Sequence, residues 1–293
     1  MQKKWNLLFF IFEDKEDVTQ TFRRFDWLNI AALSKTRARV TVWYHNIPLK
    51  EHKIIKIRNG SVTVHDISTV QSSVELLSEL KTGVETEYRP RRRNIVLIGS
   101  HCFRQYVCSN KCSVSMESWA QYCEKQHIYL DCVVMDCCYA ATLTIMRYLK
   151  NVTHYIVACQ SASPWLGFNT QDLAKIFGST RLGTRQTCVN LVKSFIARNN
   201  NAPKTLKFPT DGVVLDVKKL SPLLDSLTVM KRPKNAMVEP QWEKQIYDLK
   251  TVLTYHKNED AFHALQKIIV FYKQSNLLKK KAHACRLHGL SVY

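Results

Sequence analysis

The chain has 293 residues, 45% of them hydrophobic, and a formal net charge of +19. This length allows one large α/β domain, and only eight Gly and eight Pro argue against long low-complexity stretches. Ten cysteines in a chain too long to need a disulfide framework indicate a reducing compartment, and no segment reaches the roughly 18 apolar residues of a membrane-spanning helix.

The first predicted element is the apolar run at 5–12. It follows two lysines but continues directly into the acidic stretch at 13–17, without a small-residue cleavage site. It therefore predicts a buried strand and not a signal peptide. We accordingly expect an intracellular, cytoplasmic protein.

Continuous apolar runs, typical of strands buried on both faces, alternate with helical segments along the chain. Asn59-Gly60 between β-like runs at 53–58 and 61–64 predicts a hairpin with a type I′ turn. This rhythm predicts an α/β fold with a mostly parallel central sheet flanked by helices. The other predicted strands lie at 39–44, 94–100, 129–135 and 154–159, and the predicted helices lie near 18–34, 70–86, 115–126 and 139–150.

The pattern changes after about residue 160. Helices are predicted near 171–178 and 185–199, a last strand at 212–217, and a further helical stretch at 241–276. We therefore expect a domain at 1–217, a basic loop at 218–240 and a basic helical C-terminal extension at 241–293.

Two residues with nucleophile and base chemistry follow consecutive predicted strands. His101 comes directly after the strand at 94–100, and Cys138 follows the strand at 129–135 and opens the helix at 139–150. The carboxyl ends of parallel strands share one edge of a sheet, and N–H groups at a helix N-terminus favour a thiolate. A Cys–His pair is therefore one interpretation, and a structural histidine beside a packing cysteine is the other.

The residues around Cys138 sharpen this choice. Met135-Asp136-Cys137-Cys138-Tyr139-Ala140 resembles the D-x-C nucleophile motif of the clostripain-like, C11-type cysteine peptidases, which are relatives of caspases and gingipains. The resemblance covers roughly residues 4–200. It includes the strand and acidic turn from Lys4, the strand at 95–101, the helix and strand at 148–161, and the Gly-aromatic loop at 164–168. It implies a caspase-like three-layer sandwich.

The resemblance also implies an activity and a set of site residues. Cys138 matches the nucleophile and His101 the general base of an endopeptidase that forms an acyl-enzyme. Asp136 matches the acid of the S1 pocket, which favours Arg or Lys at P1. Cys137, Gln160 and Ser161 are expected to line the same pocket. A protein or peptide substrate and a monomer are implied, no cofactor is required, calcium is possible by analogy only, and no metal site is expected.

Two departures from the family pattern keep alternatives open. Cys102 stands where the family has Gly after the histidine, and Gln160, Ser161 and Ala162 replace acidic residues. The Cys102 substitution favours a catalytically inactive caspase-like binding module as the alternative, and the replaced acidic residues weaken the case for cleavage after Arg or Lys. A third interpretation is a basic nucleic-acid-associated protein, or one with an acidic partner, because basic residues cluster along the chain. Asp136 has its own alternative as a helix-capping residue.

Overall fold

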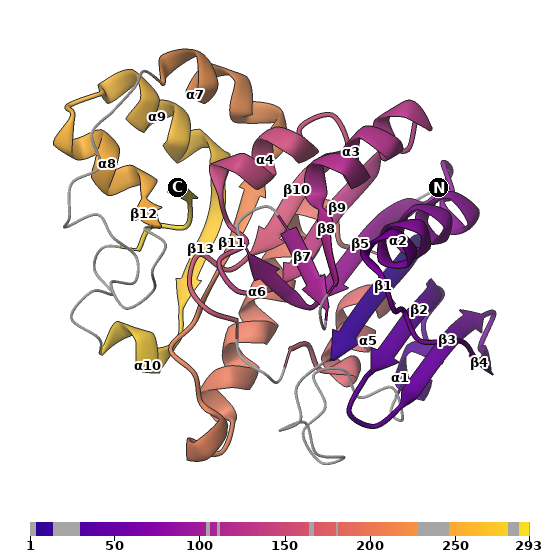
Figure 1. The fold of residues 1–293 in the computed structure, drawn as a ribbon. Coiled ribbons are helices and arrows are strands. Elements are labelled where there is room, and N and C mark those ends of the chain that lie inside the picture. The colour runs from indigo at the N-terminus through magenta and orange to yellow at the C-terminus, as the bar shows by residue number, and fades with distance from the viewer. Residues whose placement is uncertain are drawn as a thin grey trace.

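The structure, a computed structural model, describes residues 4–13, 30–103, 106–109, 112–163, 167–179, 181–227, 246–280 and 287–292. Within these ranges nine strands form one sheet in the order β13-β11-β10-β9-β5-β1-β2-β3-β4 (Figure 1). The five central strands are parallel: β1 (Trp5–Glu13), β2 (Arg39–Asn46), β5 (Arg93–Gly99), β9 (Leu130–Asp136) and β10 (Thr153–Ala158).

Antiparallel strands complete the sheet on both sides. β3 (Glu51–Arg58) and β4 (Ser61–Asp66) follow β2, and β11 (Asp211–Asp216) and β13 (Ile269–Gln274) follow β10. The turn between β3 and β4 has φ of 52° at Asn59 and 86° at Gly60, so the predicted hairpin is confirmed. The predicted central strands are confirmed to within two residues at each end.

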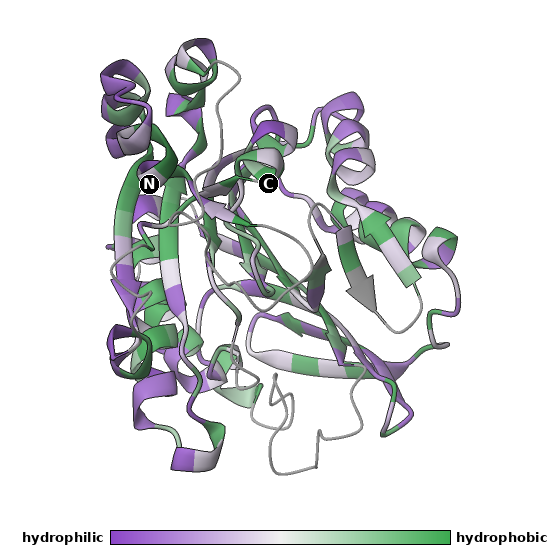
Figure 2. Cartoon of the chain, turned by 60° about the vertical axis from the view of Figure 1, so that its left-hand side comes forward, coloured by the Kyte–Doolittle hydropathy of each residue, from purple (hydrophilic) through white to green (hydrophobic). Residues whose placement is uncertain are grey.

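Helices cover both faces of this sheet and make three layers (Figure 1). Alternate residues of β1 explain why, since Leu8 and Phe10 belong to one core cluster whereas Leu7 and Phe9 belong to the other. Figure 2 shows the resulting pattern of hydrophobic central strands. One layer holds α2 (Ser73–Glu87), α3 (Met116–Lys125), α4 (Leu143–Leu149), α7 (Leu220–Ser226), α8 (Leu249–Tyr255) and α9 (Glu259–Ile268), and the other holds α1 (Ala31–Ser34), α5 (Thr170–Gly178) and α6 (Thr184–Asn201).

The predicted helical C-terminal extension is not confirmed. The helices α8 and α9 form as expected, but the next residues leave the helical path and become β13, which pairs with β11 in the central sheet. The run Ile-Val-Phe-Tyr from Ile269 is rich in β-branched and aromatic residues, which suit a strand better than a helix. One strand of the described C-terminal region, β13, is thus part of the central sheet, and the domain bounds at 217 and 240 stay predictions.

Three smaller elements complete the described chain. A second sheet contains β6 (His101–Phe103), β7 (Tyr106–Ser109) and β8 (Cys112–Ser115), and a third pairs β12 (Tyr247–Asp248) with β14 (Ser291–Val292). The short helix α10 (Asn276–Lys279) follows β13. Most of the predicted helix near 18–34 lies outside the described residues, and so do residues 228–240 of the predicted basic loop. The first part of that predicted loop is wrong, because it forms a short 3-10 helix (Val217–Lys219) and α7. No helix in the described ranges is long and apolar enough to cross a bilayer.

Candidate active site

His101 and Cys138 occupy matching places on two neighbouring parallel strands. Gly99 of β5 pairs with Asp136 of β9, and Ser100 N–H donates to the carbonyl oxygen of Asp136 at 3.3 Å, which extends the ladder by one residue. His101 and Cys138 each lie two residues beyond that pair. Both residues therefore follow neighbouring parallel strands at the carboxyl edge of the sheet.

The neighbours of these two residues in sequence are core residues. Cys102 and Cys137 are both buried in the core cluster on the α3–α4 side of the sheet. Cys138 packs instead against a separate small cluster that contains Tyr139, Ala162 and Leu278. His101 and Cys138 are both half-buried, whereas Cys137 is fully buried with Sγ donating to Ile98 O at 3.5 Å.

The burial of Cys102 and Cys137 changes the interpretation of two sequence features. The side chain of Cys102, the residue that departs from the family's Gly, packs in the core and does not point toward the open edge. Cys137 is likewise a core residue, so its burial does not support the expected place in an S1 pocket. Cys138 is the more accessible of the adjacent thiols.

The expected helix at Cys138 begins later. Thr142 is the N-cap of α4 and accepts from Ile145 N–H at 3.2 Å, so four residues separate Cys138 from the first helical residue. Tyr139 adopts a φ of 54°, which a bulky residue rarely does and which breaks the helical path. Asp136 is therefore not a cap of this helix, and the α4 dipole does not act directly on the Cys138 thiol.

A loop after β10 supplies the contact that the helix does not. The backbone N–H of Ser163 donates to Cys138 Sγ at 3.3 Å, and Ser163 Oγ donates to Asp136 Oδ1 at 2.6 Å. On the same loop, Ser161 O accepts from Tyr139 N–H at 2.9 Å. Ser163 thus contacts both the candidate nucleophile and the candidate S1 acid.

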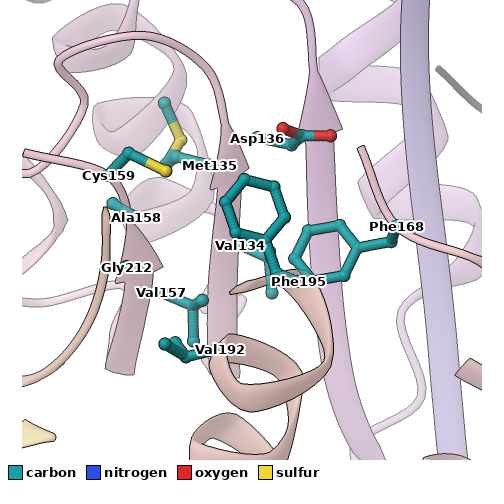
Figure 3. Close-up of a pocket in the computed structure, with 10 residues that line it drawn as sticks. All are labelled: Val134, Met135, Asp136, Val157, Ala158, Cys159, Phe168, Val192, Phe195 and Gly212. Atoms are coloured by element: carbon teal, nitrogen blue, oxygen red, sulfur yellow. The ribbon is translucent and has the colours of Figure 1, made fainter. Parts of the chain in front are cut away.

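Asp136 lies at the rim of a small internal cavity (Figure 3). Its side chain is almost fully buried, and the rest of the lining is apolar, including Val134 and Phe195. The cavity measures about 10 Å³, close to the minimum that one water molecule needs. This cavity is too small to hold a lysine or arginine side chain.

Gln160 anchors the C-terminal segment. Its Nε2 donates to Asp248 Oδ2 at 2.8 Å and to Leu290 O at 3.0 Å, and its Oε1 accepts from Gly289 N–H at 2.6 Å. His288 Nδ1 also lies 3.0 Å from Asp248 Oδ1. The Gln160 amide, expected from the resemblance to line the S1 pocket, is therefore engaged by residues more than 80 positions away in sequence.

Ser161 has a similar structural partner. Its Oγ donates to Asp211 Oδ1 at 2.8 Å and accepts from Asp211 N–H at 3.1 Å. Burial, together with the nearby Asp211 and Asp136 carboxylates, raises the pKa of the Cys159 thiol well above its usual range. Cys159, although close by, is thus held as a neutral thiol, which is a poor nucleophile.

The register adds a residue that the sequence analysis did not single out. Ile11 of β1 pairs with Gly99 of β5, so Glu13, at the end of β1, lies at the same edge of the sheet as the residues that follow β5 and β9. Its buried carboxylate accepts from Tyr44 Oη at 3.0 Å and from Asn46 Nδ2 at 2.7 Å. Ser163 and Asp211 were also missed, because an isolated Ser or Asp in a sequence carries no signal of its distant partners.

Metal binding was tested on donor geometry. In the part of the chain that the structure describes, no group of three or more His, Cys, Asp or Glu side chains could hold a metal ion. A role for calcium stays a prediction by analogy.

The structure is similar to solved structures of C11 cysteine proteases. The secreted C11 cysteine protease "iotapain" from Bacteroides thetaiotaomicron gives a TM-score of 0.70 at 11% identity, covering 99% of this chain and 93% of that chain. A secreted C11 protease from the same organism, in complex with an irreversible peptide inhibitor, gives 0.71 at 11% identity, covering 99% and 92%. An inactive zymogen C11 protease from Parabacteroides distasonis gives 0.69 at 10% identity, covering 94% and 85%.

No protein-family model and no curated protein sequence matches this chain. At such low identity the structural similarity concerns the fold, and it extends over nearly the whole chain. The resemblance first suggested by the residues around Cys138 is confirmed at that level: this chain has the caspase-like fold of the C11 cysteine proteases.

Proposed function

We propose that this chain is a cysteine endopeptidase with Cys138 as nucleophile and His101 as general base. The observation that supports the proposal is the pairing of β5 with β9, because these neighbouring parallel strands lead into His101 and Cys138 at the same edge of the sheet. Active sites of open parallel sheets form at this edge. The fold that this chain shares with C11 proteases also supports a cysteine peptidase.

The reaction follows acyl-transfer chemistry. His101 takes the thiol proton, and the Cys138 thiolate attacks the scissile carbonyl carbon to give a tetrahedral oxyanion that the Cys138 N–H helps to stabilise. Collapse of this intermediate breaks the C–N bond, and His101 protonates the departing amine. Water, deprotonated by His101, then hydrolyses the thioester and releases the new carboxylate and the free thiol.

Cleavage after Arg or Lys is the finer part of the proposal. Asp136 is a buried carboxylate two residues before the nucleophile, and a guanidinium or ammonium is its natural ionic partner. To bind such a side chain there, Ser163 must release Asp136 Oδ1 and the cavity beside it must widen. Substrate binding is therefore coupled to movement of Ser163.

The second candidate is the inactive caspase-like binding module. The Ser163 hydroxyl occupies Asp136 Oδ1, an oxygen that a basic P1 side chain would need. The nucleic-acid interpretation gains less support. Two of the basic residues form ion pairs within the molecule, because Arg58 and Arg89 lie 2.8 and 3.6 Å from Glu87. Monomeric state and acidic partners stay predictions.

One assay separates these candidates. Wild type and Cys138→Ala are incubated, with reductant and with or without calcium, with fluorogenic peptides carrying Arg, Lys, Asp or Asn at P1. Cleavage after Arg or Lys that Cys138→Ala abolishes supports the full proposal, and its selective loss in Asp136→Asn assigns the S1 acid. Cleavage after another residue retains the peptidase and removes the specificity. No cleavage, together with no labelling of Cys138 by an acyloxymethyl ketone, supports the binding module.

A further inference from the structure

Asp211 is a fully buried carboxylate near the candidate active site that the proposed reaction does not use. Its Oδ1 accepts from the backbone N–H groups of Gln160 and Ser161, both at 3.0 Å, and from Ser161 Oγ at 2.8 Å. Ser161 Oγ in turn accepts from Asp211 N–H at 3.1 Å. Such reciprocal, charge-assisted bonds fix geometry more firmly than bonds between neutral groups.

The residue before β11 continues this attachment. Thr210 Oγ1 donates to Ala162 O at 2.7 Å. Gln160, Ser161 and Ala162 are therefore each bonded either to Asp211, the first residue of β11, or to Thr210, which precedes it. The segment 160–162 has its position set from β11, a strand about 50 residues later in the chain.

The next residue of that segment is the one that contacts the nucleophile. Ser163 N–H donates to Cys138 Sγ at 3.3 Å. A hydrogen bond to the charged form of an acid stabilises that form, and the thiolate is the reactive form of cysteine. The direction of this N–H depends on the path of residues 160–162, since one peptide unit joins Ala162 to Ser163.

We propose that Asp211 is a positioning residue that holds segment 160–163 so that Ser163 N–H stabilises the Cys138 thiolate. The proposal rests on the proposed role of Cys138 as nucleophile. Asp211 acts through the loop and does not touch the substrate. Because α4 begins at Leu143, its N-terminus does not stabilise the Cys138 thiolate. The loop that Asp211 holds supplies that stabilisation instead.

The test measures thiolate reactivity directly. Full-length wild type and Asp211→Asn are treated with iodoacetamide across a pH series, and mass-spectrometric peptide mapping resolves Cys138 from the other nine of the ten cysteines. Asparagine keeps the side-chain volume and one acceptor oxygen but loses the charge. The Cys138 alkylation rate at neutral pH falls roughly threefold to tenfold, and the midpoint of its pH profile moves to higher pH.

Asp216→Asn is the matched control. Asp216 is a buried aspartate at the other end of the same strand, with His154 Nε2 at 3.6 Å and Lys219 Nζ at 3.5 Å. Its substitution costs stability of a similar kind but leaves the Cys138 pH profile unchanged. Ser161→Ala removes the hydrogen bond from Ser161 Oγ to Asp211 Oδ1. It shifts the Cys138 pH profile in the same direction as Asp211→Asn, but by less. It carries the test if Asp211→Asn does not fold.

An Asp211→Asn protein that melts as a folded chain, with the wild-type rate and pH midpoint at Cys138, overturns the proposal. An equal shift in Asp216→Asn also overturns it, because the effect is then one of general destabilisation. Peptidase activity is a separate readout. Alkylation that depends on Asp211 in a chain that cleaves no peptide retains the positioning role and refutes the peptidase, whereas cleavage with Asp211-independent alkylation does the reverse.

Discussion

The two sides of Cys138 are built in different ways. On one side, regular pairing joins β5 and β9, the strands that lead into His101 and Cys138. On the other side, the loop carrying Ser163 is held by buried polar side chains, Asp211 directly and Gln160 through the C-terminal segment. Strand pairing repeats the same backbone hydrogen bonds along the strands, whereas the polar network depends on individual side-chain bonds between residues distant in sequence.

This difference indicates where variation is tolerated. A substitution on a central strand that preserves size and hydrophobicity keeps the register, and with it the placement of His101 and Cys138. Loss of one buried polar partner leaves another group unsatisfied and moves a whole loop. We therefore expect catalysis to depend on the strand side of Cys138. The stability of the fold and the reactivity of the Cys138 thiol should depend on the loop side.

The largest expected effect compares the two adjacent thiols. Cys138→Ala lowers peptide cleavage by at least about 10³-fold, because the variant lacks the proposed nucleophile, whereas the adjacent Cys137 is buried. Cys137→Ala leaves the rate close to wild type and costs about 1 kcal/mol of unfolding free energy, as expected for a small buried hydrophobe. Steady-state kinetics and urea unfolding measure the two effects. Equal loss of activity in both variants contradicts the assignment.

The strand side is also the part that sequence patterns could predict. Continuous apolar runs identified the five parallel strands, and Asn59-Gly60 identified the hairpin, because both signals are local. The loop side was not predictable from such patterns. The partners of Gln160 lie 88 to 130 residues away, and the segment at 269–274 continues an apolar helix pattern until its pairing with β11 decides the strand.

The late start of α4 has a related cause. The sequence after Cys138 has no proline or glycine to mark a boundary, so the apolar residues suggested a helix from Tyr139 onward. In the structure Tyr139 and Ala141 N–H groups instead donate to Ser161 and Cys159 carbonyl oxygens at 2.9 Å each. Tertiary hydrogen bonding overrides local helix propensity over these residues.

The second expected effect concerns the base. His101→Asn lowers the cleavage rate by roughly 10²- to 10⁴-fold, because the asparagine cannot take the thiol proton or protonate the leaving amine. His127→Asn is the control, since His127 is exposed and has a φ of 53°, a conformation that asparagine adopts readily. Rates measured on the best fluorogenic peptide decide the matter, and an active His101→Asn protein excludes His101 as the base.

A third prediction tests the polar side through Gln160. Gln160→Ala removes three hydrogen bonds, to Asp248, Leu290 and Gly289, and lowers the free energy of unfolding by about 2–4 kcal/mol. Gln186→Ala serves as control. Gln186 is exposed on α6 and bonds only Asn190 among the contacts found, so the change stays within about 0.5 kcal/mol. Equal urea midpoints for the two variants show that Gln160 does not anchor the C-terminal segment.

The smallest expected effect is the pH dependence of stability contributed by Asp211. Burial raises the pKa of this carboxyl above its ordinary value of 3.8, although hydrogen bonds from Ser161 and Gln160 oppose the shift. The folded state then binds the proton more tightly than the unfolded chain. The contribution of Asp211 to stability therefore falls as pH rises from 3.8 through the folded-state pKa, and is constant above it. The difference in unfolding free energy between wild type and Asp211→Asn isolates this contribution, because most other carboxylates titrate alike in both proteins. A difference that rises with pH over the same range means that the hydrogen bonds to Asp211 outweigh its burial, and that the loop side of Cys138 is held by an ionised clamp even in mild acid.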